Sequence, residues 1–226
     1  MATTPVPDDY EQRLANARHA AERLPASPAR DSALRALEAA PSRREHEDAQ
    51  RRAATAGALA EELTQAGYDG TDPERIAWVR LDHAGRLVAL AFSPTVDRLS
   101  NPVVGAAVGE AWTAAEAARA GAARRLELAA ADAGLAASAD PRLAELRRLV
   151  ASRAAERFEH TTEDDLCSAE VDVEGRLAVF KFLVPNATVD NDCESLAEEA
   201  AATIRTAQQK AAESFAALAD QAFAVT

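Results

Sequence analysis

Two stretches of this chain are nearly the same: residues 76–92 read IAWVRLDHAGRLVALAF, and residues 166–182 read LCSAEVDVEGRLAVFKF. The motif D-x-x-G-R-L therefore occurs at Asp82 and again at Asp172, ninety positions later. Apolar residues alternate with other residues before and after the motif, a pattern typical of β-strands with one buried face. The repeat predicts one duplicated module, with two similar halves that pack together.

The repeated motif predicts a tight turn in each copy. Asp at the first turn position and Gly at the fourth are the signature of a type I turn that closes into a glycine bulge. Gly85 and Gly175 would then adopt the positive φ that other residues resist. We expect Asp82, Gly85, Asp172 and Gly175 to be structural turn residues that join two strands into a hairpin in each copy.

The sequence before the first hairpin has helical spacing. Residues 7–24 and 29–40 are separated by prolines, so we expect a short N-terminal helical hairpin. Residues 42–65 predict a third helix, in which Ser42 would cap the N-terminus and Glu45 would be its partner in a capping box.

Long, alanine-rich helices are predicted after the hairpins, over residues 102–131 and 194–223, and a helix over residues 140–158 would open the second copy. Aromatic residues make up only 4% of the chain, which favours a mostly helical protein with thin packing contacts. The predicted parts are an N-terminal helical hairpin at residues 1–41, a first copy at 42–133 and a second copy at 134–226.

Charge is unevenly distributed along the chain. The formal net charge is −12 at pH 7, of which residues 1–74 contribute −5, residues 75–160 contribute +2 and residues 161–226 contribute −9. Affinity for nucleic acid comes mainly from Lys and Arg, and a net acidic protein still binds if its cations gather on one face. Only the middle segment has the balance for such a surface, whereas the second copy is strongly acidic.

The sequence argues against a membrane or secreted protein. No apolar run reaches the ~18 residues of a membrane span, and the N-terminal MATTPVPDDYEQR is polar and acidic where a signal peptide is basic and then apolar. Cys167 and Cys193 are the two cysteines, which suits a reducing compartment better than a disulfide framework. We therefore expect a cytoplasmic protein without membrane contact.

Catalytic and metal-binding patterns are also missing from the sequence. The four histidines are scattered, with no Cys or His partner at ligand spacing, which argues against a metal site. No Ser, Cys or glycine-rich phosphate loop stands in a recognised catalytic setting. We expect a protein that is not an enzyme, with no cofactor and no small-molecule substrate.

The order of elements resembles the YbaB/EbfC family of bacterial nucleoid-associated proteins. The shared pattern is a helix, short strands with the D-x-x-G-R-L hairpin, an apolar strand ending near Pro, and a long alanine-rich helix, over residues 42–131 and again over 140–223. Members of that family are small dimers whose strands join across the two-fold axis, with helices that project like tweezers. The resemblance implies a mostly helical α+β fold in which two tandem modules, each a long helix, short antiparallel strands and a long helix, form a pseudo-dimer within one chain.

The resemblance also implies a function, because several members of the family bind DNA with little sequence preference. The expected partner is double-stranded DNA in the bacterial nucleoid, contacted along its backbone. The candidate nucleic-acid-binding residues are Arg124, Arg125, Arg142, Arg147, Arg148, Arg153 and Arg157.

Two alternatives stand beside DNA binding. The arginines are also explained as the solvated side of amphipathic helices, paired with Glu127, Glu145 and Glu156. The second alternative is a protein-interaction or scaffold module of the same fold without DNA binding, whose acidic surfaces hold a basic protein partner. Self-association is a further form of this alternative.

Overall fold

The computed structural model describes residues 7–135 and 140–224. Over these residues the chain forms seven α-helices and two small antiparallel sheets of three strands each, so the protein is mostly helical and has an α+β fold. The described residues fall into two compact units, 7–60 with 130–135 and 61–129 with 140–224. None of the helices in the described ranges offers a stretch with the length and hydropathy of a membrane span.

The N-terminal helices contain the helical hairpin and the capping box that the sequence predicts. Helix α1 (Tyr10–Glu22) contacts α2 (Pro28–Glu38), and α3 (Arg43–Gln65) follows. Ser42 N donates to Glu45 Oε2 at 2.7 Å, and Glu45 N donates to Ser42 Oγ at 3.3 Å. These bonds to Ser42 lower the pKa of the Glu45 carboxyl. Within α1, α2 and α3, Ala21 is the one buried side chain, so these helices contribute little core.

Each copy of the repeat forms a sheet whose strands follow one another in chain order. The strands are β1 (Tyr68–Thr71), β2 (Ala77–Leu81) and β3 (Leu87–Phe92) in the first sheet, and β4 (Phe158–Thr161), β5 (Cys167–Val171) and β6 (Leu177–Phe182) in the second. The predicted hairpins are β2–β3 and β5–β6. A register shift at Arg80/Leu81 and at Glu170/Val171 marks the bulge expected beside each turn.

The start of the second copy differs from the sequence prediction. The helix predicted over residues 140–158 is α5 (Pro141–Ser152), and the chain turns at Arg153. Residues 158–161 form β4, with Phe158 opposite Val171 of β5. Helical propensity is a weak local preference, and strand pairing with β5 overrides it here. The sequence pattern predicts neither β1 nor β4.

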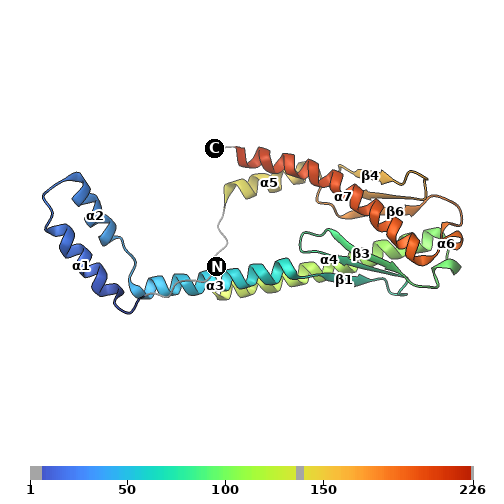
Figure 1. The fold of residues 1–226 in the computed structure, drawn as a ribbon. Helices are drawn as coiled ribbons and strands as arrows, with labels where there is room; N and C mark the ends of the chain where they lie inside the picture. The colour runs from blue at the N-terminus through green and yellow to red at the C-terminus, as the bar shows by residue number, and fades with distance from the viewer. Residues whose placement is uncertain (1–6, 136–139, 225–226) are drawn as a thin grey trace. The chain divides into compact units, whose positions relative to one another are not determined.

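One hydrophobic core contains side chains from both copies of the repeat. Helix α7 (Cys193–Ala224) contacts β3 of the first sheet as well as β4 and β5 of the second (Figure 1). Helix α4 (Asn101–Asp132) contributes Val104 and Trp112 to the same core, in which Val79 and Ile204 are fully buried. The rings of Phe92 and Phe182, the last residues of β3 and β6, lie 6.2 Å apart.

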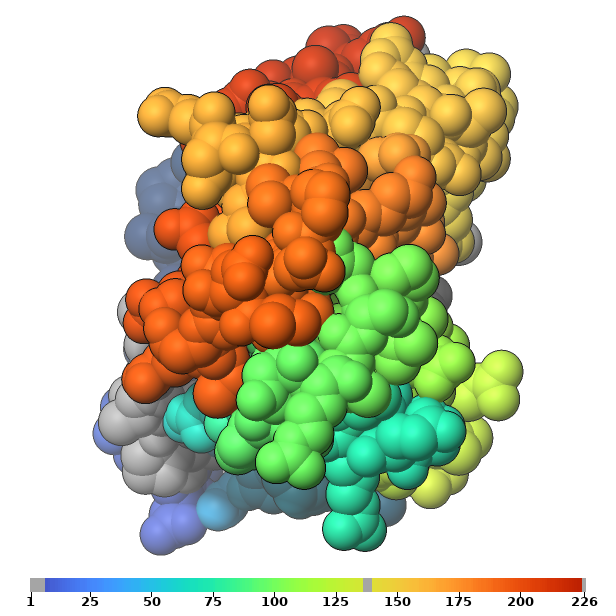
Figure 2. Space-filling model, turned by 90° about the vertical axis from the view of Figure 1, so that its right-hand side faces the viewer, coloured from blue at the N-terminus to red at the C-terminus, as the bar shows by residue number. Residues whose placement is uncertain are grey.

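A second contact between the copies lies where each hairpin leads into its long helix. These links contain the short helices η1 (Val96–Arg98) and α6 (Ala187–Asp190), which contact each other. Asn101 Nδ2 donates to Val184 O at 2.7 Å, and Thr188 Oγ1 donates to Leu99 O at 2.7 Å. Figure 2 shows the two links side by side, in green and orange.

The two cysteines are free thiols that differ in accessibility. Cys167 is fully buried, its Sγ lies 3.2 Å from Thr203 Oγ1, and burial raises the pKa of its thiol. Cys193 is partly exposed. We therefore expect one thiol per native chain to react promptly with dithionitrobenzoate at neutral pH, and two after unfolding in guanidinium. Two prompt thiols in the native protein would contradict the burial of Cys167.

Candidate functional site

The two D-x-x-G-R-L turns have the same geometry. Gly85 has a φ of +80° and Gly175 a φ of +78°, in the left-handed region expected for both. Asp82 Oδ1 accepts hydrogen bonds from Ala84 N and Arg86 N, each at 2.9 Å. Asp172 Oδ1 accepts the corresponding bonds in the second copy, also at 2.9 Å. Each Asp therefore holds its own turn closed, which is the structural role that the motif predicts.

Gln208 on α7 connects the two turns. Its Nε2 donates to Gly175 O at 2.8 Å and to Gly85 O at 3.1 Å, while its Oε1 accepts from Leu87 N at 2.9 Å. Arg205, one turn earlier on α7, donates to Leu87 O and Val88 O. Since Gln208 is 6% exposed, the three bonds of its side chain are made inside the protein. Side chains of the second copy thus satisfy backbone groups at the turn and edge strand of the first.

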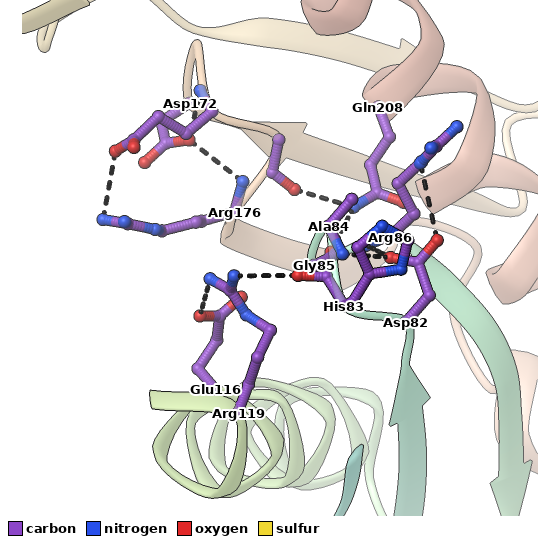
Figure 3. Close-up of polar contacts among 12 residues, drawn as sticks. Asp82, His83, Ala84, Gly85, Arg86, Glu116, Arg119, Asp172, Arg176 and Gln208 are labelled. Carbon is purple, nitrogen blue, oxygen red and sulfur yellow. Dashed lines mark hydrogen bonds and ion pairs between the residues drawn. The ribbon is translucent and has the colours of Figure 1, made fainter. Parts of the chain in front are cut away.

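The position that corresponds to Gln208 in the first copy carries Glu116. A methyl group on Gly175 would face Gln208, and one on Gly85 would face Glu116 Oε1 at 3.3 Å and the Arg119 guanidinium at 3.5 Å. Glu116 does not bridge the turns; its Oε2 accepts from Arg119 Nη2 at 2.7 Å. Arg119 Nη1 also donates to His83 O at 3.4 Å. The contact between the turns is therefore asymmetric (Figure 3).

A hollow lies between the two turns. Its walls also include residues of α4 and of α7. This turn hollow has a volume of about 500 Å³, and its charged lining residues are Arg86, Arg119, Arg176, Glu116 and Glu174. Three buried atoms beside the first turn have no hydrogen-bond partner within the described part of the chain: Glu116 Oε1, Arg119 Nε and His83 Nδ1. Buried polar atoms are normally paired, so these three unsatisfied atoms distinguish the first turn from the second.

The turn hollow continues into a second one between the second turn and α5. The second hollow measures about 440 Å³ and is lined by the apolar side chains of Leu146, Val150 and Phe215, with Arg147 at its border. Val173, Glu174, Arg176 and Phe215 line both hollows. Arg147 is the one predicted DNA-binding residue that the structure brings to this region.

Three of the seven predicted DNA-binding arginines are engaged with carboxylates. Arg142 binds Asp140 through Nε at 3.0 Å and Nη2 at 2.8 Å, and Arg148 binds Glu145 at 2.8 and 2.6 Å. These guanidinium groups lower the pKa of Asp140 and of Glu145. Arg153 lies 3.5 Å from Glu156. The ion pairs anticipated with Glu145 and Glu156 are therefore present, although such exposed pairs are weak.

The other four arginines divide into two groups. Arg157 donates to the carbonyl oxygens of Ala154 and Glu156 and, like Arg153, follows the end of α5 and does not lie on a helix. Arg124 and Arg125 on α4 and Arg147 on α5 are exposed, and within the described ranges their side chains form no ion pair. The seven arginines thus come from separate elements, α4, α5 and the segment after α5.

An acidic groove lies on the second copy, between the β4–β5 connection and α7. It measures about 440 Å³ and is lined by Glu163, Asp164 and Glu199, together with His160 and four small residues. These carboxylates form no ion pair within the residues that the structure describes. These three carboxylates belong to residues 161–226, which carry a charge of −9, and the groove brings them together.

One further group of carboxylates stands near β2. Ligand atoms of Asp72, Glu74 and Glu110 lie within 4.8 Å of one another. Asp72 is 2% exposed, but its two oxygens already accept hydrogen bonds from Ala77 N at 2.7 Å and Glu74 N at 3.1 Å. These bonds give Asp72 a role in closing the β1–β2 connection, and the expectation of no metal site stays a prediction.

Sequence reasoning missed three residues that line the turn hollow, namely Gln208, Glu116 and Arg119. Gln208 had a detectable signal, because it lies four residues after Ile204 and three before Ala211, on the apolar face of α7. A polar side chain on such a face needs buried partners. Comparison with known proteins adds no further assignment, since no family model, curated protein or solved structure matches this chain.

Proposed function

We propose that this chain is a DNA-binding protein of the nucleoid-associated, YbaB/EbfC type, which contacts the duplex backbone with little sequence specificity. The observation that carries the proposal is the single core shared by the two copies, with Gln208 bonded to both repeated turns. Two sheets that share one core, each with the long helix that follows it, correspond to the dimer of small subunits implied by the family resemblance. The two copies then form the pseudo-dimer within one chain.

The cations available to DNA are those without a carboxylate partner. Arg124, Arg125 and Arg147 are exposed and unpaired within the described ranges, whereas Arg142, Arg148 and Arg153 are already matched with acids. Each phosphate neutralised by a protein cation releases counterions, with a slope of about −0.9 in log K against log salt. Three such contacts give a slope of roughly −3 in log K against log salt, and only modest affinity. The net charge of −12 repels DNA at long range, which also limits the affinity.

Fluorescence anisotropy with a short generic duplex tests this assignment. We expect binding at low salt that weakens with salt, and loss of at least tenfold in affinity when Arg124, Arg125 and Arg147 are all changed to Gln. The matched control changes Arg142, Arg148 and Arg153 to Gln, which alters the net charge equally, and its affinity should fall less than threefold. Equal losses in the two variants would show that net charge, and no particular surface, governs binding.

The acidic groove favours a second candidate function, a scaffold that holds a basic protein segment. Glu163, Asp164 and Glu199 line the groove without ion-pair partners in the described residues, and this arrangement suits Lys or Arg side chains. Under this alternative the duplex is not retained even at low salt. A basic partner recovered with the wild-type chain is then lost when Glu163 and Glu199 are changed to Gln.

A further inference from the structure

The turn hollow combines a pocket volume with unsatisfied polar atoms. Its volume of about 500 Å³ is within the range of small-molecule sites, roughly 300 to 1,000 Å³. It exists only because the two copies pack together, since one turn, α4 and the other turn each supply part of its wall (Figure 3). Nothing in the contact between the turns uses Arg119 Nε or Glu116 Oε1.

The donors around the turn hollow suit an oxyanion. Arg119 and Arg176 approach it from α4 and from the second turn, and Arg86 lines it from the first turn while contacting Asp82 at 3.5 Å. Guanidinium groups present planar sets of N–H donors that match the oxygens of phosphate. Each of the three arginines is paired with one carboxylate, so the preference for an oxyanion comes from the N–H groups of the guanidinium groups and not from an excess of positive charge.

Glu116 and Glu174 do not cancel this preference. Glu116 Oε2 is bound to Arg119 at 2.7 Å, and Glu174 lies 3.2 Å from Arg176 Nη1, so each carboxylate positions a guanidinium group. The pair of Arg119 with Glu116 is 25% and 20% exposed, and its geometry is held by the surrounding turn.

We propose that the turn hollow binds a phosphoryl group, carried by a small phosphate monoester or by the nucleic-acid backbone. Phosphoryl oxygens accept hydrogen bonds from the guanidinium groups of Arg119 and Arg176, which line the hollow. The proposal goes beyond DNA binding through Arg124, Arg125 and Arg147, and neither depends on the other. It adds a ligand class to a chain whose sequence indicates no small-molecule substrate.

Isothermal titration calorimetry of the full chain with AMP tests the proposal. We expect saturable binding of one AMP per chain and no binding of adenosine, which lacks the phosphate. Arg176→Gln and Arg119→Lys should each raise the Kd at least tenfold; Arg176 is half exposed, so its variant folds normally. Arg142→Gln should leave the Kd unchanged, because Arg142 is paired with Asp140 and does not line the turn hollow.

Three results would overturn the proposal: no heat of binding with AMP at millimolar concentration, equal binding of adenosine and AMP, or an unchanged Kd for Arg176→Gln. A competition arm separates the two sources of phosphate. If a short duplex displaces AMP, the site belongs to the DNA-contacting surface. If the duplex binds without displacing AMP, the ligand is a small phosphate monoester.

Discussion

Replacing Gly70 by alanine is expected to lower the free energy of unfolding by at least about 3 kcal/mol and the Tm by roughly 10 °C. A methyl carbon on Gly70 would lie 2.1 Å from Ala111 O, 2.2 Å from Ala115 N and 2.8 Å from Ala115 Cα. All three atoms belong to the backbone of α4, so no side-chain rotation relieves the overlap. Strand β1 and helix α4 would have to move apart, which opens the core around Ala111 and Ala115, both fully buried.

The matched control for Gly70→Ala is the same substitution at Gly109. Gly109 lies inside α4, is exposed, and a methyl group there meets no atom within 4 Å. Alanine is favoured over glycine in a helix interior, so Gly109→Ala should raise stability by about 0.5 to 1 kcal/mol. Thermal and urea unfolding measured by circular dichroism compare the two. A Gly70→Ala protein as stable as the wild type would show that α4 does not lie directly on β1.

The hairpins could be predicted from sequence because their signals are local. The carboxylate at Asp82 and the positive φ at Gly85 act within one turn, and the alternation of β2 and β3 identifies the buried face. The capping box of Ser42 and Glu45 is local in the same sense. Such features require only residues a few positions apart.

The missed strands have no comparable local signal. Strand β1 reads YDGT, with two residues that are unfavourable in strands, and it forms because each of its residues pairs with β2, for example Gly70 with Val79. Strand β4 follows an arginine- and alanine-rich segment that has helical propensity. In both cases the decisive interaction is with a strand farther along the chain, which a window of sequence does not contain.

The candidate site was predictable only in part for a related reason. The sequence gives the positions of Arg142, Arg148 and Arg153, but their availability depends on the carboxylates that face them in the fold. Likewise, Gln208 contacts Gly85 across 123 positions of sequence. Contacts between the copies depend on how the duplicated modules pack, and the repeat alone does not specify this packing.

Gln208→Leu is expected to destabilise the protein by roughly 3 kcal/mol, because it leaves Gly85 O, Gly175 O and Leu87 N without their buried partner. The volumes of the two side chains are similar, so the loss reports hydrogen bonding more than packing. Gln209→Leu is the matched control, since Gln209 is the next residue on α7 and is exposed. Its stability should stay within about 0.5 kcal/mol of the wild type.

Gln208→Glu separates the acceptor role of this side chain from its donor role. It gives the second copy the residue type that the first copy has at Glu116. A carboxylate still accepts from Leu87 N but cannot donate to the two glycine carbonyls, and burial beside these oxygens favours its protonated form. The pKa of this glutamate is about 4.3 in the unfolded chain and would be higher in the folded state. The folded state therefore binds more protons than the unfolded chain.

The free energy of unfolding of Gln208→Glu should therefore fall as pH rises from about 4.3, relative to wild type, and level off above the folded-state pKa. Urea unfolding at several pH values measures this difference, and hydrogen exchange at the Leu87 amide reports whether the contact between the turns persists. If Gln208→Leu and Gln209→Leu are equally stable, the hydrogen bonds of Gln208 do not contribute to holding the two turns together. If only Gln208→Leu unfolds early, the bridge between the turns stabilises the packing of one copy against the other, beside the shared core.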